Sequence, residues 1–268
     1  MYEQYYGLAE KPFSLTPDTG YFYQSNTHQE ALNVLLVAIK SGDGFIKVTG
    51  EVGTGKTLLC RKLLDALDEA YNTVYIPNPY MNCNALLDAV LAEMGIAEQL
   101  NKENYLACIN DYLIESARQS KTTVIILDEA QSLPEESLEA IRLLSNLETE
   151  KKKLVQIILF GQPELDDKLA KSSIRQLRQR IMHVYRLQPL NQNSIRAYLQ
   201  HRMKSAGYSG PELFDQAARQ LLFKASQGVP RIINVLSNKA LMQSYASGDY
   251  HVTRKHIISA VKDNDERH

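Results

Sequence analysis

The sequence has no long apolar run and no marked excess of charge of either sign. No stretch reaches the roughly 18–20 apolar residues that span a bilayer, and residues 1–13, MYEQYYGLAEKPF, lack the basic region and apolar run of a signal peptide. The formal net charge of −1 gives no global attraction to nucleic acid or to an anionic membrane. These absences favour a cytoplasmic protein and argue against nucleic acid as its partner.

Cysteine and histidine are also sparse. The three cysteines, Cys60, Cys83 and Cys108, are widely spaced and form no C-x-x-C pair, so we expect reduced thiols that pack as small apolar residues. The six histidines show no metal-ligand spacing, which predicts no histidine-based metal site.

Short apolar runs alternate with longer helical patterns over the first 190 residues. Each run is rich in β-branched or aromatic residues and nearly continuous in apolar ones, which is typical of strands buried on both faces of a parallel sheet. The expected strands are residues 45–49, 73–77, 123–127, 154–160 and 183–187. The alternation predicts right-handed βαβ units, and hence an α/β fold with a parallel five-stranded sheet flanked by helices.

After residue 190 the pattern is wholly helical. Helical periodicity covers residues 192–206, 212–227, 230–247 and 253–264, with Gly207 and Gly228 as helix ends and Thr253 as an N-cap. The 268 residues suffice for one large core and a smaller satellite domain. We therefore expect an α/β base domain over 1–190 and a helical lid domain over 191–268.

Residues 50–57 match the phosphate-binding pattern G-x-x-x-x-G-K-[ST] in full, between an apolar run and a helical pattern. Glycines let such a loop turn its backbone N–H groups toward phosphate oxygens, and the helix that follows favours an anion at its N-terminus. Lys56 would contact the β- and γ-phosphates, and the Thr57 hydroxyl would ligate Mg²⁺. The alternative is a glycine turn with a surface lysine. The predicted nucleotide-binding residues are Gly50, Glu51, Val52, Gly53, Thr54, Gly55, Lys56, Thr57 and Leu58.

Two carboxylates, Asp128 and Glu129, end the expected strand 123–127. Ligands of parallel sheets bind at the carboxyl ends of the strands, so we expect both acids beside residues 50–57. Asp128 would hold Mg²⁺, and Glu129 would orient and polarise the attacking water. The alternative for Glu129 is an acid at a helix start, favoured by the helix dipole. Gln162, after the next strand, would touch the γ-phosphate or the water, or belong to an ordinary strand-to-helix turn.

Two groups of basic residues have more than one interpretation. Residues 171–186 contain five of them and no acid: Lys171, Arg175, Arg178, Arg180 and Arg186. This run would supply an arginine finger to the ATP of a neighbouring subunit, bind a nucleic-acid backbone or form a solvated helix face. Arg231, at the start of a lid helix, would swing onto ATP as the lid closes or pair with surface acids.

Aromatic residues gather near Pro12 and Pro17. They are Tyr5, Tyr6, Phe13, Tyr21, Phe22 and Tyr23. One interpretation places residues 1–25 at the adenine pocket, with these rings as its wall. The other packs the rings on the outer face of the base domain.

Taken together, these residues resemble the ExeA/GspA-type AAA+ ATPases of bacterial secretion and pilus systems. The resemblance covers nearly the whole chain. Residues 46–50 (IKVTG) and 57–61 (TLLCR) look most like the ATPases of MSHA pilus biogenesis. The segments that carry the resemblance are, in order, YGL at 6–8, KPFSLTPD at 11–18, HQEAL at 28–32, VTGEVGTGKT at 48–57, LDEAQ at 127–131 and GQPEL at 161–165.

The resemblance implies a P-loop AAA+ fold that takes ATP and Mg²⁺. It also implies that Gln162 is sensor 1, that Arg231 is sensor 2, and that Arg180 is the arginine finger, with Arg178 as second choice. A homo-oligomer in the ATP-bound state follows as well, with an inner-membrane pilus or secretion assembly protein as partner. ExeA-type proteins often carry a membrane span and a peptidoglycan-binding module after the ATPase. This sequence ends at His268 with neither, so we expect it to be peripheral at the inner membrane through that partner.

The leading hypothesis is an ATPase that drives conformational change or oligomerisation in MSHA-like type IV pilus or type II secretion assembly. Two alternatives remain open. One is a DNA-dependent ATPase regulator of the transposition type, since transposition ATPases share these motifs. The other is a nucleotide-gated scaffold with little turnover.

Overall fold

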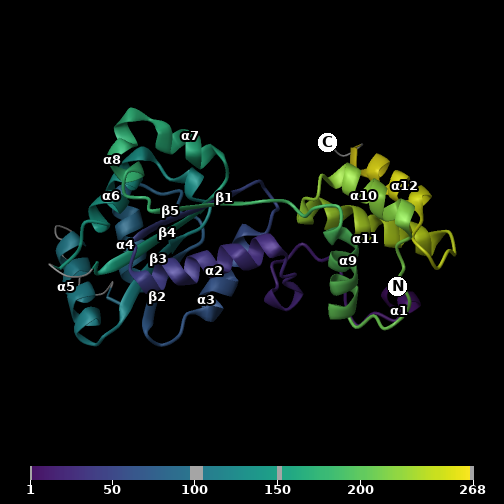
Figure 1. Cartoon of the computed structure of the whole chain (residues 1–268), viewed down its shortest axis with the longest axis horizontal. Coiled ribbons are helices and arrows are strands. Elements are labelled where there is room, and N and C mark those ends of the chain that lie inside the picture. Colours follow the sequence, from purple (N-terminus) through teal and green to yellow (C-terminus); the bar gives the residue numbers. More distant parts are fainter. Residues whose placement is uncertain (1, 97–104, 150–152, 266–268) are drawn as a thin grey trace. The chain divides into compact units, whose positions relative to one another are not determined.

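A computed structural model describes residues 2–96, 105–149 and 153–265 (Figure 1). Contacts between residues divide the chain into two compact units. The helical unit comprises Met1–Asn26, Gly53–Leu58 and Gln188–His268, and the α/β unit comprises Thr27–Val52 and Leu59–Leu187.

The α/β unit is centred on a parallel five-stranded sheet with the order β2-β3-β4-β1-β5. All five predicted strands are present, and the second begins two residues before its predicted start. This confirms the predicted fold class. The strands are β1 (Phe45–Gly50), β2 (Tyr71–Ile76), β3 (Thr122–Leu127), β4 (Val155–Gly161) and β5 (His183–Leu187).

Helices cover both faces of this sheet (Figure 1). Alternate residues of a strand point to opposite faces, and accordingly Ile125 and Ile126 of β3 belong to different cores. One core includes buried residues of α2 (Asn26–Ser41) and α3 (Lys56–Ala66). The other includes residues of α4 (Cys83–Glu93), α5 (Tyr105–Arg118), α6 (Glu135–Leu144), α7 (Glu164–Ala170) and α8 (Arg175–Arg178).

The helical unit contains the four helices expected after residue 190. They are α9 (Ser194–Ser205), α10 (Gln216–Ser226), α11 (Pro230–Ala246) and α12 (Arg254–Asp265). The predicted start of α10 at residue 212 is wrong. Asp215 caps this helix instead, because its carboxylate accepts a hydrogen bond from the N–H of Ala218 at 2.6 Å. The preceding Phe214 forms a β-bridge with Val252, which holds the chain extended there.

The N-terminal segment packs into the core of the helical unit. Tyr6 and Phe13 are buried there beside residues of the later helices. Buried Arg202 of α9 ties the segment down: its guanidinium donates to the carbonyls of Pro12 at 2.6 Å and Ser14 at 3.0 Å, and it lies 4.4 Å from the Tyr21 ring centroid. Residues 1–25 therefore group with the lid helices rather than with the base domain to which they were assigned. Their role as a wall of the adenine pocket stays a prediction.

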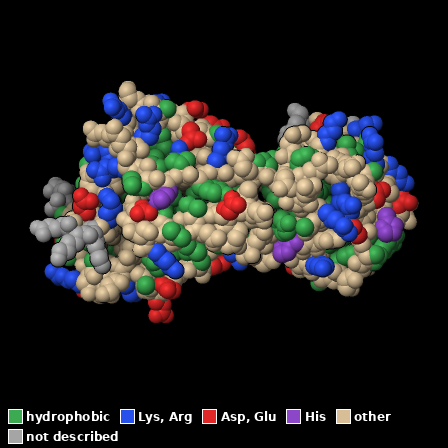
Figure 2. Space-filling model, in the orientation of Figure 1, with side chains coloured by type: hydrophobic (Ala, Val, Ile, Leu, Met, Phe, Trp, Pro, Cys, Tyr) green, Lys and Arg blue, Asp and Glu red, His purple; other side chains and the backbone are tan. Residues whose placement is uncertain are grey.

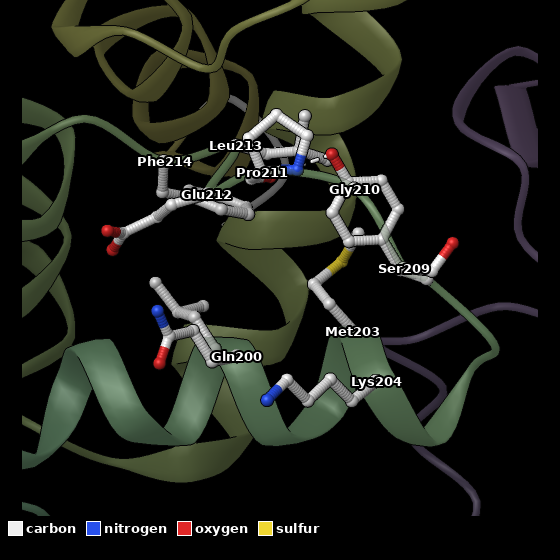
Figure 3. Close-up of a pocket in the computed structure, with 11 residues that line it drawn as sticks. Gln200, Met203, Lys204, Ser209, Gly210, Pro211, Glu212, Leu213 and Phe214 are labelled. Atoms are coloured by element: carbon white, nitrogen blue, oxygen red, sulfur yellow. Dashed lines mark hydrogen bonds between the residues drawn. The ribbon is translucent and has the colours of Figure 1, made fainter.

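A small pocket lies in the helical unit between α9 and residues 208–214 (Figure 3). Its volume is about 110 Å³, and Met203, Tyr208 and Phe214 contribute apolar surface to it. The carboxylate of Glu212 at this pocket is already paired with Arg219 and, at 3.0 Å, with Arg196. The lining contains none of the residues predicted to bind nucleotide, so this pocket is not the predicted phosphate site.

Candidate functional site

Residues 50–57, the P-loop, connect the buried strand β1 to helix α3, which begins at Lys56. The first N–H groups of a helix have no partner within it and form a ready anion site. Because α3 begins at Lys56, both Lys56 and Thr57 lie in its first turn, beside these N–H groups. The Lys56 side chain is not a surface lysine, since the residue is only 5% exposed. This burial argues against the simple glycine turn.

Gly53 meets the lid helix α11 directly, and both belong to the helical unit. The main-chain N–H of Arg231 donates to the carbonyl of Gly53 at 3.2 Å. Gly53 has φ +81°, and a Cβ at this position would lie 2.5 Å from the Cβ of Arg231. Only glycine fits at this close approach to α11. The Arg231 side chain itself is exposed.

The two carboxylates directly follow β3. Asp128 is 1% exposed, and its N–H donates to the carbonyl of Ile76 at the end of β2 at 3.0 Å. Its Oδ1 accepts the N–H of Glu129 at 2.9 Å. Glu129 has φ +54° and ψ +37°, the left-handed region that glycine favours, which costs a glutamate about 1 kcal/mol or more. Strain of this kind is common at functional sites.

Three carboxyl and carboxamide groups converge where β3 and β4 end. These strands are neighbours with Leu127 opposite Leu159, so Glu129 and Gln162 follow adjacent strand ends. The Glu129 Oε2 accepts from Gln162 Nε2 at 3.1 Å and from Gln131 Nε2 at 2.5 Å. The Gln131 Oε1 accepts the main-chain N–H of Gln162 at 3.0 Å. The structure thus brings Glu129 and Gln162 into contact and adds Gln131 to them.

Lys168 of α7 holds the turn that contains Gln131. Its ammonium donates to the main-chain carbonyls of Gln131 at 2.5 Å and Leu133 at 2.6 Å. Burial lowers the pKa of Lys168, and the nearby Lys171 lowers it further. No sequence motif assigned a role to Gln131 or Lys168. The only signal was the string LDEAQ, which places Gln131 two residues after Glu129.

The candidate arginine finger, Arg180, is bonded to Ser145 at the end of α6. Arg180 Nη1 donates to the carbonyl of Ser145 at 3.1 Å and to its Oγ at 3.4 Å, and the side chain is half-buried. Arg178 is exposed, and its side chain makes no hydrogen bond or ion pair within the described residues. Two other members of the basic run pair with acids: Lys171 with Glu135 at 2.5 Å and Arg186 with Glu51 at 3.9 Å.

A family model described as an AAA domain matches residues 39–169, which contain the P-loop, both carboxylates and Gln162. The solved structure of Cdc6p from Pyrobaculum aerophilum matches with a TM-score of 0.70 at 19% identity, over 94% of this chain and 70% of that one. The chain has the AAA-type P-loop fold.

Other AAA-type neighbours share this fold at low sequence identity. The Aeropyrum pernix ORC2 protein, described as ADPNP–ADP complexes, matches with a TM-score of 0.63 at 17% identity, over 93% of this AAA-type chain and 72% of that chain. The ORC1 protein of the same organism, in complex with DNA, matches with a TM-score of 0.64 at 19% identity. The match covers 95% of this chain and 69% of that chain. At these identities the likeness concerns the fold.

One curated relative is much more similar in sequence. General secretion pathway protein A from Aeromonas hydrophila is 40% identical over 262 residues, which make up 97% of this AAA-type chain and 48% of that protein. The match supports the resemblance to the ExeA/GspA type. The chain spans about half the length of this relative. In the part of the chain that the structure describes, no helix has both the length and the apolar character needed to cross a membrane.

Proposed function

We propose that this chain binds Mg·ATP through residues 50–58 and hydrolyses it with Glu129. The observation that carries the proposal is the complete G-x-x-x-x-G-K-T loop between buried strand β1 and helix α3, with Lys56 buried in the first turn. The AAA-type fold implies nucleotide binding, and the resemblance to ExeA/GspA-type proteins favours ATP over GTP.

Each residue of the proposed site has a chemical task. Lys56 would hold the β- and γ-phosphates, and Arg231 would respond to the nucleotide at the start of α11. Thr57 and Asp128 suit Mg²⁺, because hydroxyl and carboxylate oxygens are the ligands that it prefers. Bound Mg²⁺ would neutralise charge on the phosphates. Glu129 would polarise the attacking water, and Gln162 would sense the γ-phosphate.

Phosphate release from the purified chain with Mg·ATP, measured with and without membranes, tests the hydrolytic part of the proposal. We expect steady turnover that requires Mg²⁺. If ATP binds yet no phosphate forms under either condition, the nucleotide-gated scaffold becomes the better account.

The proposed setting is assembly of a type II secretion system or an MSHA-like type IV pilus. Support comes from the name of the curated relative and from the resemblance of residues 46–50 and 57–61 to the MSHA pilus biogenesis protein MshM. ATP-driven conformational change or oligomerisation would act on an inner-membrane assembly protein. We accordingly place the chain in the cytoplasm, peripheral at the inner membrane through that partner.

We further propose that ATP promotes a homo-oligomer in which Arg180 reaches the nucleotide of a neighbouring subunit. Within the described residues, the hydrogen bonds of Arg180 use one of its two terminal nitrogens, so donors remain while the guanidinium is already restrained. Restraint reduces the entropy lost on contact with phosphate. Exposed Arg178 has no such restraint.

Arg180→Ala should therefore abolish the ATP-dependent increase in mass and lower turnover by on the order of 10³-fold. Mass measurement in solution, with and without Mg·ATP, checks this result. Arg178→Ala is the matched variant and should oligomerise as the wild type does. Loss of the oligomer in Arg178→Ala alone would move the assignment to Arg178.

A DNA-dependent regulator is the second candidate, because a structural neighbour is described in complex with DNA. The charge distribution argues against it: Lys171 and Arg186 are paired with acids, and Figure 2 shows acidic as well as basic side chains over the region of α7 and α8. A gel shift at low salt decides the matter. Saturable duplex binding with a steep salt dependence would favour the DNA-dependent reading.

A further inference from the structure

Both polar atoms of the Gln131 carboxamide are engaged. The oxygen accepts the main-chain N–H of Gln162 at 3.0 Å, and the nitrogen donates to Glu129 Oε2 at 2.5 Å. A main-chain N–H can only donate, so the amide oxygen must face Gln162 and the NH₂ group must face Glu129. The hydrogen-bond pattern therefore permits one orientation of this amide.

The backbone of Gln131 is fixed as well. Lys168 binds the carbonyls of Gln131 and Leu133 from α7, the helix that directly follows Gln162 and Pro163. One short segment of chain, from Gln162 to Lys168, thus holds both the side chain and the main chain of Gln131. A side chain with this much support is well suited to fix the direction of a neighbour.

That neighbour, Glu129, is anchored through one oxygen only. Gln131 and Gln162 both donate to Oε2, and within the described residues Oε1 receives no hydrogen bond. A carboxylate held in this way presents its second oxygen in a set direction. Orienting a water molecule for attack requires such a direction, because the base must lie within hydrogen-bond reach of the proton that it takes.

We propose that Gln131 is the positioning residue for Glu129. It anchors Oε2 so that Oε1 faces the attacking water, and it links that carboxylate to the Gln162 turn. Gln131 acts through Glu129 and does not touch the nucleotide. The inference rests on the proposed ATPase function and adds to it a residue that neither motif matching nor the family resemblance assigned.

Gln131→Glu is the sharpest test. The new side chain can still accept the Gln162 N–H, but it turns an oxygen toward Glu129 in place of the NH₂ donor. We expect kcat to fall about 10–100-fold, while the Kd for ATP stays within about 2-fold. A change in kcat at constant Kd separates a role in positioning Glu129 from a role in binding the nucleotide.

Gln131→Ala removes the anchor without adding a charge. We expect a comparable loss in kcat, again with little change in the Kd for ATP. The control is Gln119→Glu, since Gln119, an exposed residue just after α5, also donates its amide to a glutamate, Glu115, at 3.1 Å. It should leave both kcat and the Kd for ATP unchanged. Thermal unfolding and ATP binding confirm that each variant is folded.

The outcomes separate the two claims. If the wild type hydrolyses ATP and both Gln131 variants match or exceed its kcat, the positioning role is wrong and the ATPase proposal stands. If the wild type releases phosphate no faster than Glu129→Gln, the proposed hydrolysis is wrong and the positioning role fails with it.

Discussion

Glu129→Gln will bind Mg·ATP as tightly as the wild type and will release phosphate about 10²–10⁴-fold more slowly. Glutamine keeps the size of the side chain but cannot polarise water or accept its proton. Binding should persist because Glu129 is assigned to the attacking water and not to the phosphates. Single-turnover phosphate release and equilibrium ATP binding, measured on the same preparation, separate the two effects.

The matched control is Glu136→Gln. Glu136 is an exposed glutamate of the neighbouring helix α6, and its loss should not change turnover. Hydrolysis at the wild-type rate by Glu129→Gln would refute the role assigned to Glu129. A folded Glu129→Gln variant that no longer binds ATP would instead show that this carboxylate belongs to the binding site.

Lys56→Ala should lose nucleotide binding, with a cost of about 3 kcal/mol, or on the order of 10²-fold in Kd. The Lys56 side chain is buried at the first turn of α3. Removing its charge leaves the phosphate oxygens without their main cation in a place where solvent cannot substitute for it. Calorimetric titration with Mg·ATP gives the affinity directly.

Lys62→Ala tests whether the effect belongs to this position. Lys62 lies on the same helix, is partly exposed and pairs at 4.0 Å with Asp65. The Lys62→Ala variant should therefore bind ATP as the wild type does. Equal affinities for Lys56→Ala and the wild type would mean that the P-loop lysine does not contact phosphate. Thermal unfolding of both variants shows whether each of them is folded.

The main features of the fold could be predicted because they depend on local pattern. Strands such as β3 are apolar along their whole length, since both faces are covered. The P-loop is a contiguous motif, and its strand and helix adjoin it in the sequence. Glu129 and Gln162 each follow one of two successive apolar runs, and parallel strands end at the same edge, but their direct contact was not predicted.

Other features depend on side-chain contacts that no sequence pattern encodes. Gln131 reaches Gln162 across 31 positions only because β3 and β4 pair in one register. The bond from Arg180 to Ser145 spans 35 positions. The N-terminal segment joined the helical unit because Arg202, some 190 positions away, binds the carbonyl of Pro12. From the sequence alone, the aromatic residues of this segment could line the adenine pocket or pack on the outer face of the base domain.

The capacity of the P-loop to hold a triphosphate is tested most directly by calorimetric titration of the full chain with ATP in the presence of Mg²⁺. We predict saturable heat that disappears in Lys56→Ala and persists in Lys62→Ala. A folded wild-type chain that gives no binding heat with any purine nucleoside triphosphate and Mg²⁺ would contradict the proposed function.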